Sequence, residues 1–214
     1  MIEIQTPLTI FLVSYVIGSF PSAYLVGRLN HINIFEIGSG NMGANNVVRS
    51  LGFKWGFVVW MMDSLKGILA VVLARRIMPN DEISASVISA IAVVVGHNWS
   101  FLATLITGRL RGGKGVSTAA GTMLMMAPAQ VIIVTLSLWA VTVLLTRYVS
   151  LGVLVSVAIG SALMLLMIGL QYGIPSAYSY YTIAIASMIY VRHWKNIRSL
   201  LQGRERRLGE RVTS

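Results

Sequence analysis

Most of the chain between residues 7 and 191 consists of apolar runs separated by short polar loops. A helix needs about 20 apolar residues to cross roughly 30 Å of hydrocarbon, and several runs approach or exceed that length. Hydrophobic residues make up 56% of the 214 residues and charged residues only 11%, so a water-soluble domain could not enclose the apolar side chains. We therefore predict an integral membrane protein whose chemistry sits between helices or in their loops.

The apolar runs predict an all-α polytopic membrane protein with seven transmembrane helices, with six as the alternative. Pro21 lies inside the first run, where a neighbour must satisfy the carbonyl that a proline frees. Pro128 divides a run too long for one upright span. The third span ends near residue 95, or near 106 if it continues past Gly96. The expected spans are 8–29, 55–73, 83–95 or 83–106, 116–126, 129–145, 151–170 and 178–191.

The distribution of basic residues predicts the orientation. The tail from Arg192 carries seven Lys and Arg residues against two acids, and such a segment stays in the cytoplasm. Seven spans then place the N-terminus outside and most other basic residues inside, with Arg75 and Arg76 as exceptions near the outer end of the second span. Six spans would separate the polar loops from the tail. We expect one domain, 1–214, with cytoplasmic loops at about 31–54, 107–116 and 146–150 and a cytoplasmic tail, 192–214.

Composition excludes several kinds of chemistry. The chain has no cysteine, which excludes disulfides and thiolate nucleophiles. No His and Glu pair at helical spacing indicates a metal site, and the aromatic and Met residues fit helix packing better than a cofactor site, so we predict no metal and no cofactor. The net charge of +10 fits attraction to anionic membrane lipids and substrates, not nucleic acid.

The polar loop after the first span combines four glycines and four asparagines at 31–52. Asn41, Asn45 and Arg49 are spaced by four residues, so they share a face wherever the segment is helical. The segment from Gly38 to Gly40 places backbone amides and the Ser39 hydroxyl where they could bind an anion. The alternative is a glycine-rich turn whose asparagines cap helix ends.

The second loop, GRLRGGKG at 108–115, nearly matches the nucleotide-binding pattern GxxxxGK[ST], but Gly115 stands where Ser or Thr should ligate the metal. This departure, and the lack of a soluble α/β domain to supply the strand and helix of the motif, disfavour a nucleotide P-loop. Open amides at Gly112, Gly113 and Gly115 beside the Lys114 ammonium still suit a phosphate monoester. The alternative is a flexible basic loop on the cytoplasmic side.

Other polar residues interrupt the apolar runs or follow them. Asp63 and Lys66 are three residues apart on one helical face, where they either pair to lock helices together or take part in binding. His97, near the inner end of the third span, is a candidate general base or phosphate ligand, or simply a hydrogen-bonded structural histidine. Further candidates near the membrane surface are Ser150, His193, Asn196 and Glu205.

Taken together, these segments resemble the bacterial acyl-phosphate:glycerol-3-phosphate acyltransferases, the PlsY family. The blocks that carry the resemblance follow the family order over most of the chain. The chain departs from the family at Ser100, where a proline is usual, at Asn46, and in a longer link between His97 and GGKG. The matching blocks are GSGNMGANNVVRSLG, DSLKG, GHNW, GGKGVST, RYVSLG and HWKNIRSLLQGRE.

The resemblance implies transfer of an acyl chain from acyl phosphate to the 1-hydroxyl of sn-glycerol 3-phosphate, giving lysophosphatidic acid and phosphate, the first step of phospholipid synthesis. It also implies a seven-helix protein of the bacterial inner membrane, with a site facing the cytoplasm. We expect a monomer whose partners are these two substrates and membrane lipids. The implied catalytic residues are Ser39, Arg49, His97, Lys114 and Ser150, and the implied binding residues are Gly40, Asn41, Asn45, Lys66, Gly112, Gly113, Gly115, His193, Asn196 and Glu205.

The HxxxxD pattern of other glycerolipid acyltransferases is missing, so no His–Asp relay is expected. Acyl phosphate is already activated, and the task is to position two phosphorylated substrates and neutralise charge on the leaving phosphate. The group that accepts the proton of the attacking hydroxyl is His97, His193 or a substrate phosphate, and the sequence does not select among them. The alternative functions are a transporter or channel for a phosphorylated metabolite, or a membrane scaffold with a lipid-binding tail.

Overall fold

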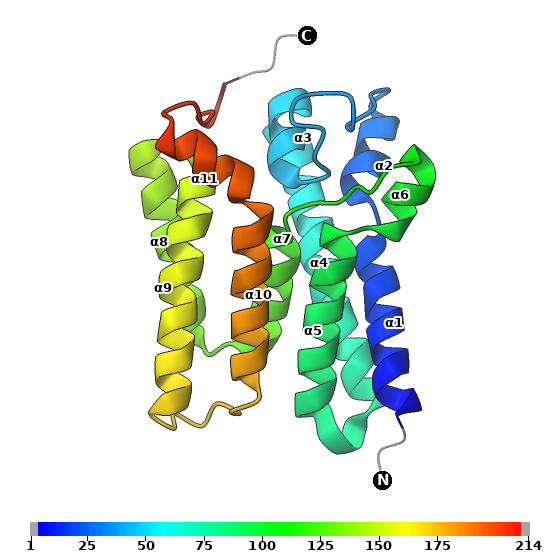
Figure 1. The fold of residues 1–214 in the computed structure, drawn as a ribbon, viewed down its shortest axis with the longest axis vertical. Helices are drawn as coiled ribbons and strands as arrows, with labels where there is room; N and C mark the ends of the chain where they lie inside the picture. The colour runs from blue at the N-terminus through cyan, green and yellow to red at the C-terminus, as the bar shows by residue number, and fades with distance from the viewer. Residues whose placement is uncertain (1–3, 211–214) are drawn as a thin grey trace. The chain divides into compact units, whose positions relative to one another are not determined.

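The computed structural model describes residues 4–210, and within that range the regular secondary structure is helical, joined by loops, with one isolated bridge between Ser100 and Arg111 (Figure 1). The chain forms two compact units, the first within residues 4–125 and the second at Met126–Glu210. Of the tail's predicted basic residues, Arg211 lies outside the described range.

Three long helices form the body of the first unit: α1 (Gln5–Ser19), α4 (Phe53–Ile77) and α5 (Glu82–Asn98), which pack against one another. Shorter elements join them. They are α2 (Ser22–Leu29), α3 (Ala44–Leu51), the 3-10 turn η1 (Pro79–Asp81), α6 (Phe101–Thr107) and α7 (Val116–Met126).

Glycines allow these helices to approach closely, as is common between membrane helices. A Cβ on Gly18 of α1 would lie 2.0 Å from the Val93 carbonyl oxygen of α5. A Cβ on Gly96 of α5 would lie 2.2 Å from the Tyr15 carbonyl oxygen of α1. Gly121 of α7 meets the Ser64 carbonyl of α4 in the same way, at 2.0 Å. Backbone therefore packs directly on backbone at each contact.

The predicted continuous first helix is wrong, because the chain breaks at Phe20 and Pro21 between α1 and α2. Proline has no N–H to donate and its ring disrupts the preceding turn. Carbonyls freed at the break find partners on other helices: the Ser100 hydroxyl donates to the Ser19 carbonyl and the Lys66 ammonium donates to the Phe20 carbonyl at 3.2 Å. These contacts are what a proline in a membrane helix requires.

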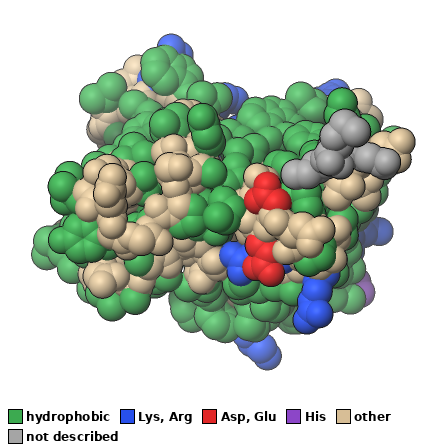
Figure 2. All heavy atoms as spheres, turned by 90° about the horizontal axis from the view of Figure 1, so that it is seen from below, with side chains coloured by type: hydrophobic (Ala, Val, Ile, Leu, Met, Phe, Trp, Pro, Cys, Tyr) green, Lys and Arg blue, Asp and Glu red, His purple; other side chains and the backbone are tan. Residues whose placement is uncertain are grey.

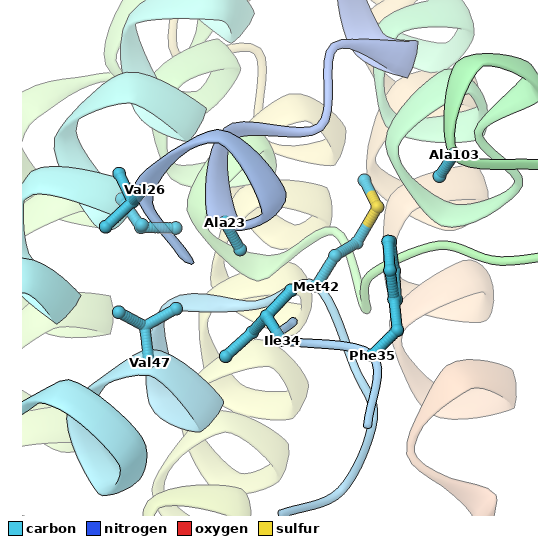
Figure 3. Packing of buried hydrophobic residues seen from close by; sticks show 8 residues of the cluster. Ala23, Val26, Ile34, Phe35, Met42, Val47 and Ala103 are labelled. Carbon is cyan, nitrogen blue, oxygen red and sulfur yellow. The ribbon is translucent and has the colours of Figure 1, made fainter. Parts of the chain in front are cut away.

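A small apolar core holds the loop between α2 and α3 against the helices (Figure 3). Ile34 and Met42 of the loop are buried with Ala23 and Val26 of α2 and with α3 and α6. The loop is therefore anchored by its own apolar residues, and its polar residues are left to line the surface.

The second unit contains α8 (Ala129–Thr146), α9 (Val149–Gly169), α10 (Tyr178–Arg192) and α11 (Trp194–Leu201). α9 packs against α8 and α10, and α11 lies across the end of α9 and α10. Gly160 of α9 fits against Thr135 of α8, where a Cβ would lie 2.2 Å from the threonine hydroxyl. The tail helix α11 was not predicted, because its eight residues mix basic and apolar side chains.

Four helices among the described residues are long and apolar enough to cross a membrane. They are the broken pair α1–α2 (Gln5–Leu29), α4, α8 and α9. Many large apolar side chains remain exposed on them, such as Leu69 on α4 and Leu144 on α8. Hydrophobic side chains cover most of the face seen in Figure 2, and charged ones are few. The exposed apolar side chains along the helices suit contact with lipid, as the sequence predicted.

The boundaries of the predicted spans agree closely with the helices, with one exception besides Pro21. The third span ends at Asn98, and the predicted extension to residue 106 is a separate helix, α6. α5 and α10 have 17 and 15 residues, so the seven-span count stays a prediction.

The exceptional Arg75 has a structural role. Its guanidinium donates to the Ser86 hydroxyl of α5 at 2.8 Å and to the Met125 carbonyl at the end of α7 at 3.1 Å. Arg75 thus links three helices of the first unit. The positive-inside rule concerns basic residues in loops, so it does not apply to an arginine held between helices.

Candidate active site

The buried amide of Asn46, on α3, organises the first polar loop. It accepts a hydrogen bond from the Ser39 backbone N–H at 3.0 Å and donates to the Ile34 and Ile37 carbonyls at 3.2 and 3.1 Å. Gly38 and Gly40 adopt positive φ angles of 66° and 62°, which glycine reaches without strain. The loop is thus a fixed turn that leaves the Ser39 side chain exposed.

The predicted face of Asn41, Asn45 and Arg49 forms only in part. α3 begins at Ala44, so Asn45 and Arg49 lie one turn apart on this helix, and Asn41 precedes it in the loop. The Asn41 side-chain oxygen is buried and makes no hydrogen bond. A buried acceptor of this kind suits a donor such as a substrate hydroxyl.

The second loop, 112–115, packs on the last turn of α5. The Gly113 N–H donates to the His97 carbonyl at 2.8 Å. A Cβ on Gly112 would lie 2.0 Å from the Asn98 carbonyl oxygen, and one on Gly113 would lie 1.8 Å from His97 Nε2. These two glycines are therefore required by packing, and the Gly113 amide, which the sequence predicted to face an anion, is used within the protein.

Arg111 joins the two loops. Its guanidinium carbon lies 5.5 Å from the centroid of the Phe35 ring, and a Cβ on Gly40 would lie 3.5 Å from its Nη1. The Arg111 carbonyl accepts from the Ser100 N–H at 2.9 Å, which closes the chain around α6. The first loop and the start of the glycine loop are therefore held together through one cation.

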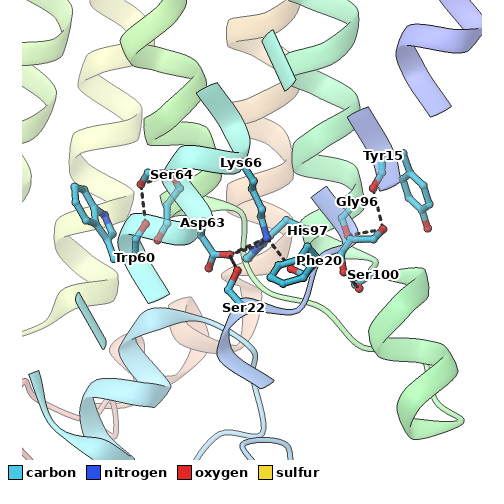
Figure 4. Close-up of polar contacts among 12 residues, drawn as sticks. Tyr15, Phe20, Ser22, Trp60, Asp63, Ser64, Lys66, Gly96, His97 and Ser100 are labelled. Atoms are coloured by element: carbon cyan, nitrogen blue, oxygen red, sulfur yellow. Dashed lines mark hydrogen bonds and ion pairs between the residues drawn. The ribbon is translucent and has the colours of Figure 1, made fainter. Parts of the chain in front are cut away.

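A buried polar cluster lies behind the glycine loop (Figure 4). The Lys66 ammonium donates to Asp63 Oδ1 at 2.8 Å and to His97 Nδ1 at 2.8 Å, in addition to the Phe20 carbonyl. The Ser22 hydroxyl donates to Asp63 Oδ1 at 2.9 Å. All of these side chains are buried.

This cluster fixes the roles of two predicted site residues. A lysine ammonium has three donors, and each finds an acceptor here, so the geometry argues against the predicted binding of phosphate by Lys66. Lysine has no acceptor, so His97 Nδ1 must accept the bond and the neutral ring carries its proton on Nε2. In this arrangement His97 Nδ1 is engaged by Lys66 within the buried cluster.

Asp63 and His97 do not form a catalytic dyad. Asp63 Oδ1 and His97 Nδ1 are 3.7 Å apart, which is too long for a hydrogen bond, and the Lys66 ammonium contacts both. The cluster connects the α1–α2 break, α4 and the end of α5, and therefore positions the backbone on which the glycine loop rests.

The second unit gathers three other predicted residues around one carboxylate. Glu205 Oε1 accepts hydrogen bonds from the Ser150 hydroxyl at 2.8 Å and from the Asn196 amide at 2.7 Å. Ser150 is at the start of α9, Asn196 is on α11, and Glu205 follows α11 in the tail. The carboxylate thereby ties the tail to the two helix ends.

His193, between α10 and α11, is buried, and its Nδ1 lies 2.8 Å from the Ile189 carbonyl. A carbonyl only accepts, so Nδ1 carries the proton, and Nε2 of the neutral ring is the acceptor nitrogen. This is the opposite tautomer to that of His97.

The tail after α11 folds back onto the connection between α8 and α9. The Leu208 N–H donates to the Arg147 carbonyl at 2.7 Å, and the Arg147 guanidinium donates to the Leu208 carbonyl at 2.9 Å. The Arg207 guanidinium stacks on the Tyr148 ring and donates to its hydroxyl at 3.4 Å, a contact that raises the pKa of Arg207. These contacts within the second unit hold the described part of the basic tail against the α8–α9 connection.

The predicted residues thus form two groups. The first unit contains Ser39 and Gly40 on the first loop, Asn45 and Arg49 on α3, and Lys114 and the glycines on the second loop, with His97 and Lys66 behind them. Sequence reasoning missed Asn46 and Arg111. The only sequence signals for them were their positions: Asn46 directly follows Asn45, and Arg111 directly precedes GGKG. No group of three or more His, Asp or Glu suited to a metal occurs in the described range, and the absence of a metal requirement stays a prediction.

The apolar helices and the glycine- and asparagine-rich loops define an integral membrane protein with a candidate site for a phosphorylated compound. The family model for glycerol-3-phosphate acyltransferase matches residues 8–203. The chain belongs to this family, the PlsY acyltransferases.

Relatives and a solved structure from this family match this chain over nearly its whole length. Glycerol-3-phosphate acyltransferase 2 of Moorella thermoacetica is 38% identical over 200 residues, covering 93% of this chain and 96% of its own. A glycerol-3-phosphate acyltransferase of Thermus thermophilus is 38% identical over 206 residues, covering 94% of both chains. The crystal structure of PlsY in its glycerol 3-phosphate form superposes with a TM-score of 0.81 at 32% identity, covering 95% of this chain and 96% of that one.

Proposed function

We propose that this acyltransferase moves an acyl chain from acyl phosphate to the 1-hydroxyl of glycerol 3-phosphate. The hydroxyl oxygen attacks the acyl carbonyl carbon, and the bond from that carbon to the phosphate oxygen breaks. The hydroxyl proton passes to a base, and lysophosphatidic acid and inorganic phosphate leave. No covalent acyl-enzyme is needed, because the donor is already activated and phosphate is a good leaving group.

The observation that carries the proposal is the junction of the two loops through Arg111. It brings the Gly38–Asn41 turn close to the start of the glycine loop, which continues to Lys114. Arg49 and Lys114 supply permanent positive charge for phosphate groups, and Ser39, Asn41 and Asn45 supply hydrogen bonds. Charge that moves onto the leaving phosphate during transfer is stabilised best by such prearranged groups.

The hydroxyl proton passes to His97, to His193 or to a substrate phosphate. His97 Nδ1 accepts a hydrogen bond from Lys66 in the cluster behind the glycine loop. His193 Nδ1 lies 2.8 Å from the Ile189 carbonyl in the second unit. We infer that Ser150, Asn196 and Glu205 form the framework that holds α11 and the residues beside His193 in place.

The charge distribution supports a multi-pass protein of the bacterial inner membrane with seven spans, an external N-terminus and a site facing the cytoplasm. With seven spans, both polar loops, the α8–α9 connection and the basic tail share one side of the membrane. We propose that the chain works as a single domain and as a monomer, with the donor's acyl chain lying in the surrounding bilayer.

The test is an assay of purified protein in detergent with palmitoyl phosphate and glycerol 3-phosphate. We expect stoichiometric release of lysophosphatidic acid and phosphate, and no product when palmitoyl-CoA replaces palmitoyl phosphate. Lysophosphatidic acid formed from palmitoyl-CoA and glycerol 3-phosphate, but not from palmitoyl phosphate, would contradict the proposed donor. It would not contradict glycerol 3-phosphate as the acceptor. Transport of glycerol 3-phosphate into proteoliposomes without acyl transfer would support the transporter instead.

A further inference from the structure

The short helix α6 has its polar and apolar faces reversed for a helix in a solvated loop. Leu105 and Ile106 point outward with exposed fractions of 72% and 48%, and Leu110, just beyond the helix, is 71% exposed. A loop helix in water places polar residues on its outer face and apolar residues inward. The outer face of α6 instead resembles the lipid-facing surface of a span.

The small and polar residues of α6 lie away from its exposed apolar face. Ala103 is fully buried against the core that holds the first polar loop. The hydroxyl of Thr104 donates to the Ser100 carbonyl at 2.7 Å, and that of Thr107 to the Ala103 carbonyl at 2.8 Å. Both hydroxyls are therefore satisfied by the backbone and do not require water.

The depth of α6 agrees with contact with lipid. α5 begins at the polar η1 turn and has 17 residues, so it rises about 25 Å. α6 begins at Phe101, three residues after the end of α5. The hydrocarbon layer is about 30 Å thick, so the start of α6 lies close to its boundary. The Ser100 hydroxyl, which caps α6, also donates to the Ser19 carbonyl at the end of α1, within the body of the unit.

Figure 1 shows α6 beside α2, at the end of the first unit that carries the polar loops. Leu29, at the end of α2, is also exposed, at 65%. The exposed Arg109 follows the C-cap Gly108 of α6 and directly precedes Leu110. An apolar face followed by an exposed cation complements the acyl chains and phosphate groups of one leaflet.

We propose that residues 101–110 are an interfacial membrane anchor. The apolar face of α6 and Leu110 lie among the acyl chains at the membrane surface, and Arg109 lies among the headgroup phosphates. Since the Arg111 carbonyl accepts from Ser100 and the chain continues directly into Gly112, the anchor fixes the height of the glycine loop relative to the bilayer. The occupant of the exposed face is thus the lipid bilayer.

The test uses fluorescence, because the chain has no cysteine and a single one is easily labelled. Leu105→Cys and Leu110→Cys are labelled with an environment-sensitive dye in vesicles of phosphatidylcholine and phosphatidylglycerol. Leu69→Cys on α4 serves as the lipid-exposed control, and Glu36→Cys in the first polar loop serves as the aqueous control. Each dye is quenched separately with aqueous iodide and with lipids that carry a nitroxide near the headgroup.

We expect both anchor positions to be quenched by the nitroxide lipids and to be protected from iodide at least several-fold relative to Glu36→Cys. Iodide quenching equal to that at Glu36→Cys would overturn the proposal. Protection from both quenchers would also overturn it, since it would indicate a protein contact or a second copy of the chain. The measurement does not depend on catalysis, so its result is separate from the proposed acyl donor.

Discussion

The Lys66 ammonium lies 2.8 Å from Nδ1 of His97, although 31 residues separate them in the chain. This hydrogen bond fixes the histidine tautomer, and the same ammonium neutralises Asp63 and supports the carbonyl at the Pro21 break. The lysine and the histidine that the sequence predicted to bind and to catalyse therefore contact each other in a buried cluster behind the glycine loop. The predictions below separate support from chemistry.

Arg49→Ala and Lys114→Ala each remove a permanent charge from the loops that we propose bind phosphate. We expect each change to lower kcat/KM by about a hundredfold or more, because charged contacts to the transferred group stabilise the transition state. The measurement is initial-rate kinetics with palmitoyl phosphate. Arg76→Ala, which removes an exposed arginine from the end of α4, is the control and should keep full activity. Full activity in both loop variants would refute this site.

His193→Gln and His97→Asn each alter one of the candidate proton acceptors, and His97→Asn keeps an oxygen near the position of Nδ1 for Lys66. We expect His193→Gln to lower kcat by about a hundredfold or more, as loss of a general base does, and His97→Asn to lower it by less than about tenfold. The comparison is made on kcat at saturating substrate. The reverse order of effects would return the role of base to His97.

Gly113→Ala places a methyl group 1.8 Å from His97 Nε2, so either the loop or the histidine must move. We expect a raised KM for glycerol 3-phosphate and a lower melting temperature in detergent. Gly43→Ala is the matched control, since nothing lies within 4 Å of its Cβ position and its φ is −107°. Equal behaviour of the two variants would show that the packing against α5 does not constrain the loop.

Lys66→Met removes one partner of a buried ion pair and leaves Asp63 uncompensated. We expect a loss of stability of about 3–5 kcal/mol, much of which Asp63→Asn should restore in the double variant. The double variant also tests the binding role. If Lys66 only supports the fold, the stable double variant keeps its KM for glycerol 3-phosphate within about threefold, whereas a phosphate ligand would raise KM regardless of stability.

Asp81 caps the N-terminus of α5, where its carboxylate accepts from the Ser84 N–H at 3.0 Å. Side-chain and backbone hydrogen bonds with Ser84 lower the pKa of Asp81 from its ordinary value of 3.8. A carboxyl group whose pKa is lower in the folded than in the unfolded protein stabilises the fold at pH values above its unfolded-state pKa. That stabilisation is lost as the pH falls through its folded-state pKa.

We therefore expect Asp81→Ala to cost about 1 kcal/mol at neutral pH. The difference from the wild type should shrink as the pH is lowered below 3.8. Urea unfolding followed by helix signal across the pH range measures this. A constant difference at all pH values would mean that the carboxylate charge does not contribute.

Several features were predictable because they depend on local sequence. The division at Pro128 follows from missing backbone donors and limited span length, and both helices beside it were placed correctly. The Asp63 and Lys66 pair followed from their separation of three residues on one helix. The motif blocks identified the family. α6 and α11 were missed as separate helices. They have seven and eight residues, about two turns each, which is too short for a helical repeat of apolar residues to be recognised.

The sequence by itself determined that this is a helical membrane protein of the PlsY family with basic, glycine-rich loops, because hydrophobic content, helical period and motif order are all readable along one chain. Only the tertiary structure decided that Asn46 organises the first loop, that Arg111 joins it to the second, and that the Lys66 ammonium meets Nδ1 of His97. Each depends on hydrogen bonds or packing that sequence spacing alone did not predict. A side chain's role is settled by which partner uses its donors, and folding alone brings distant partners within reach.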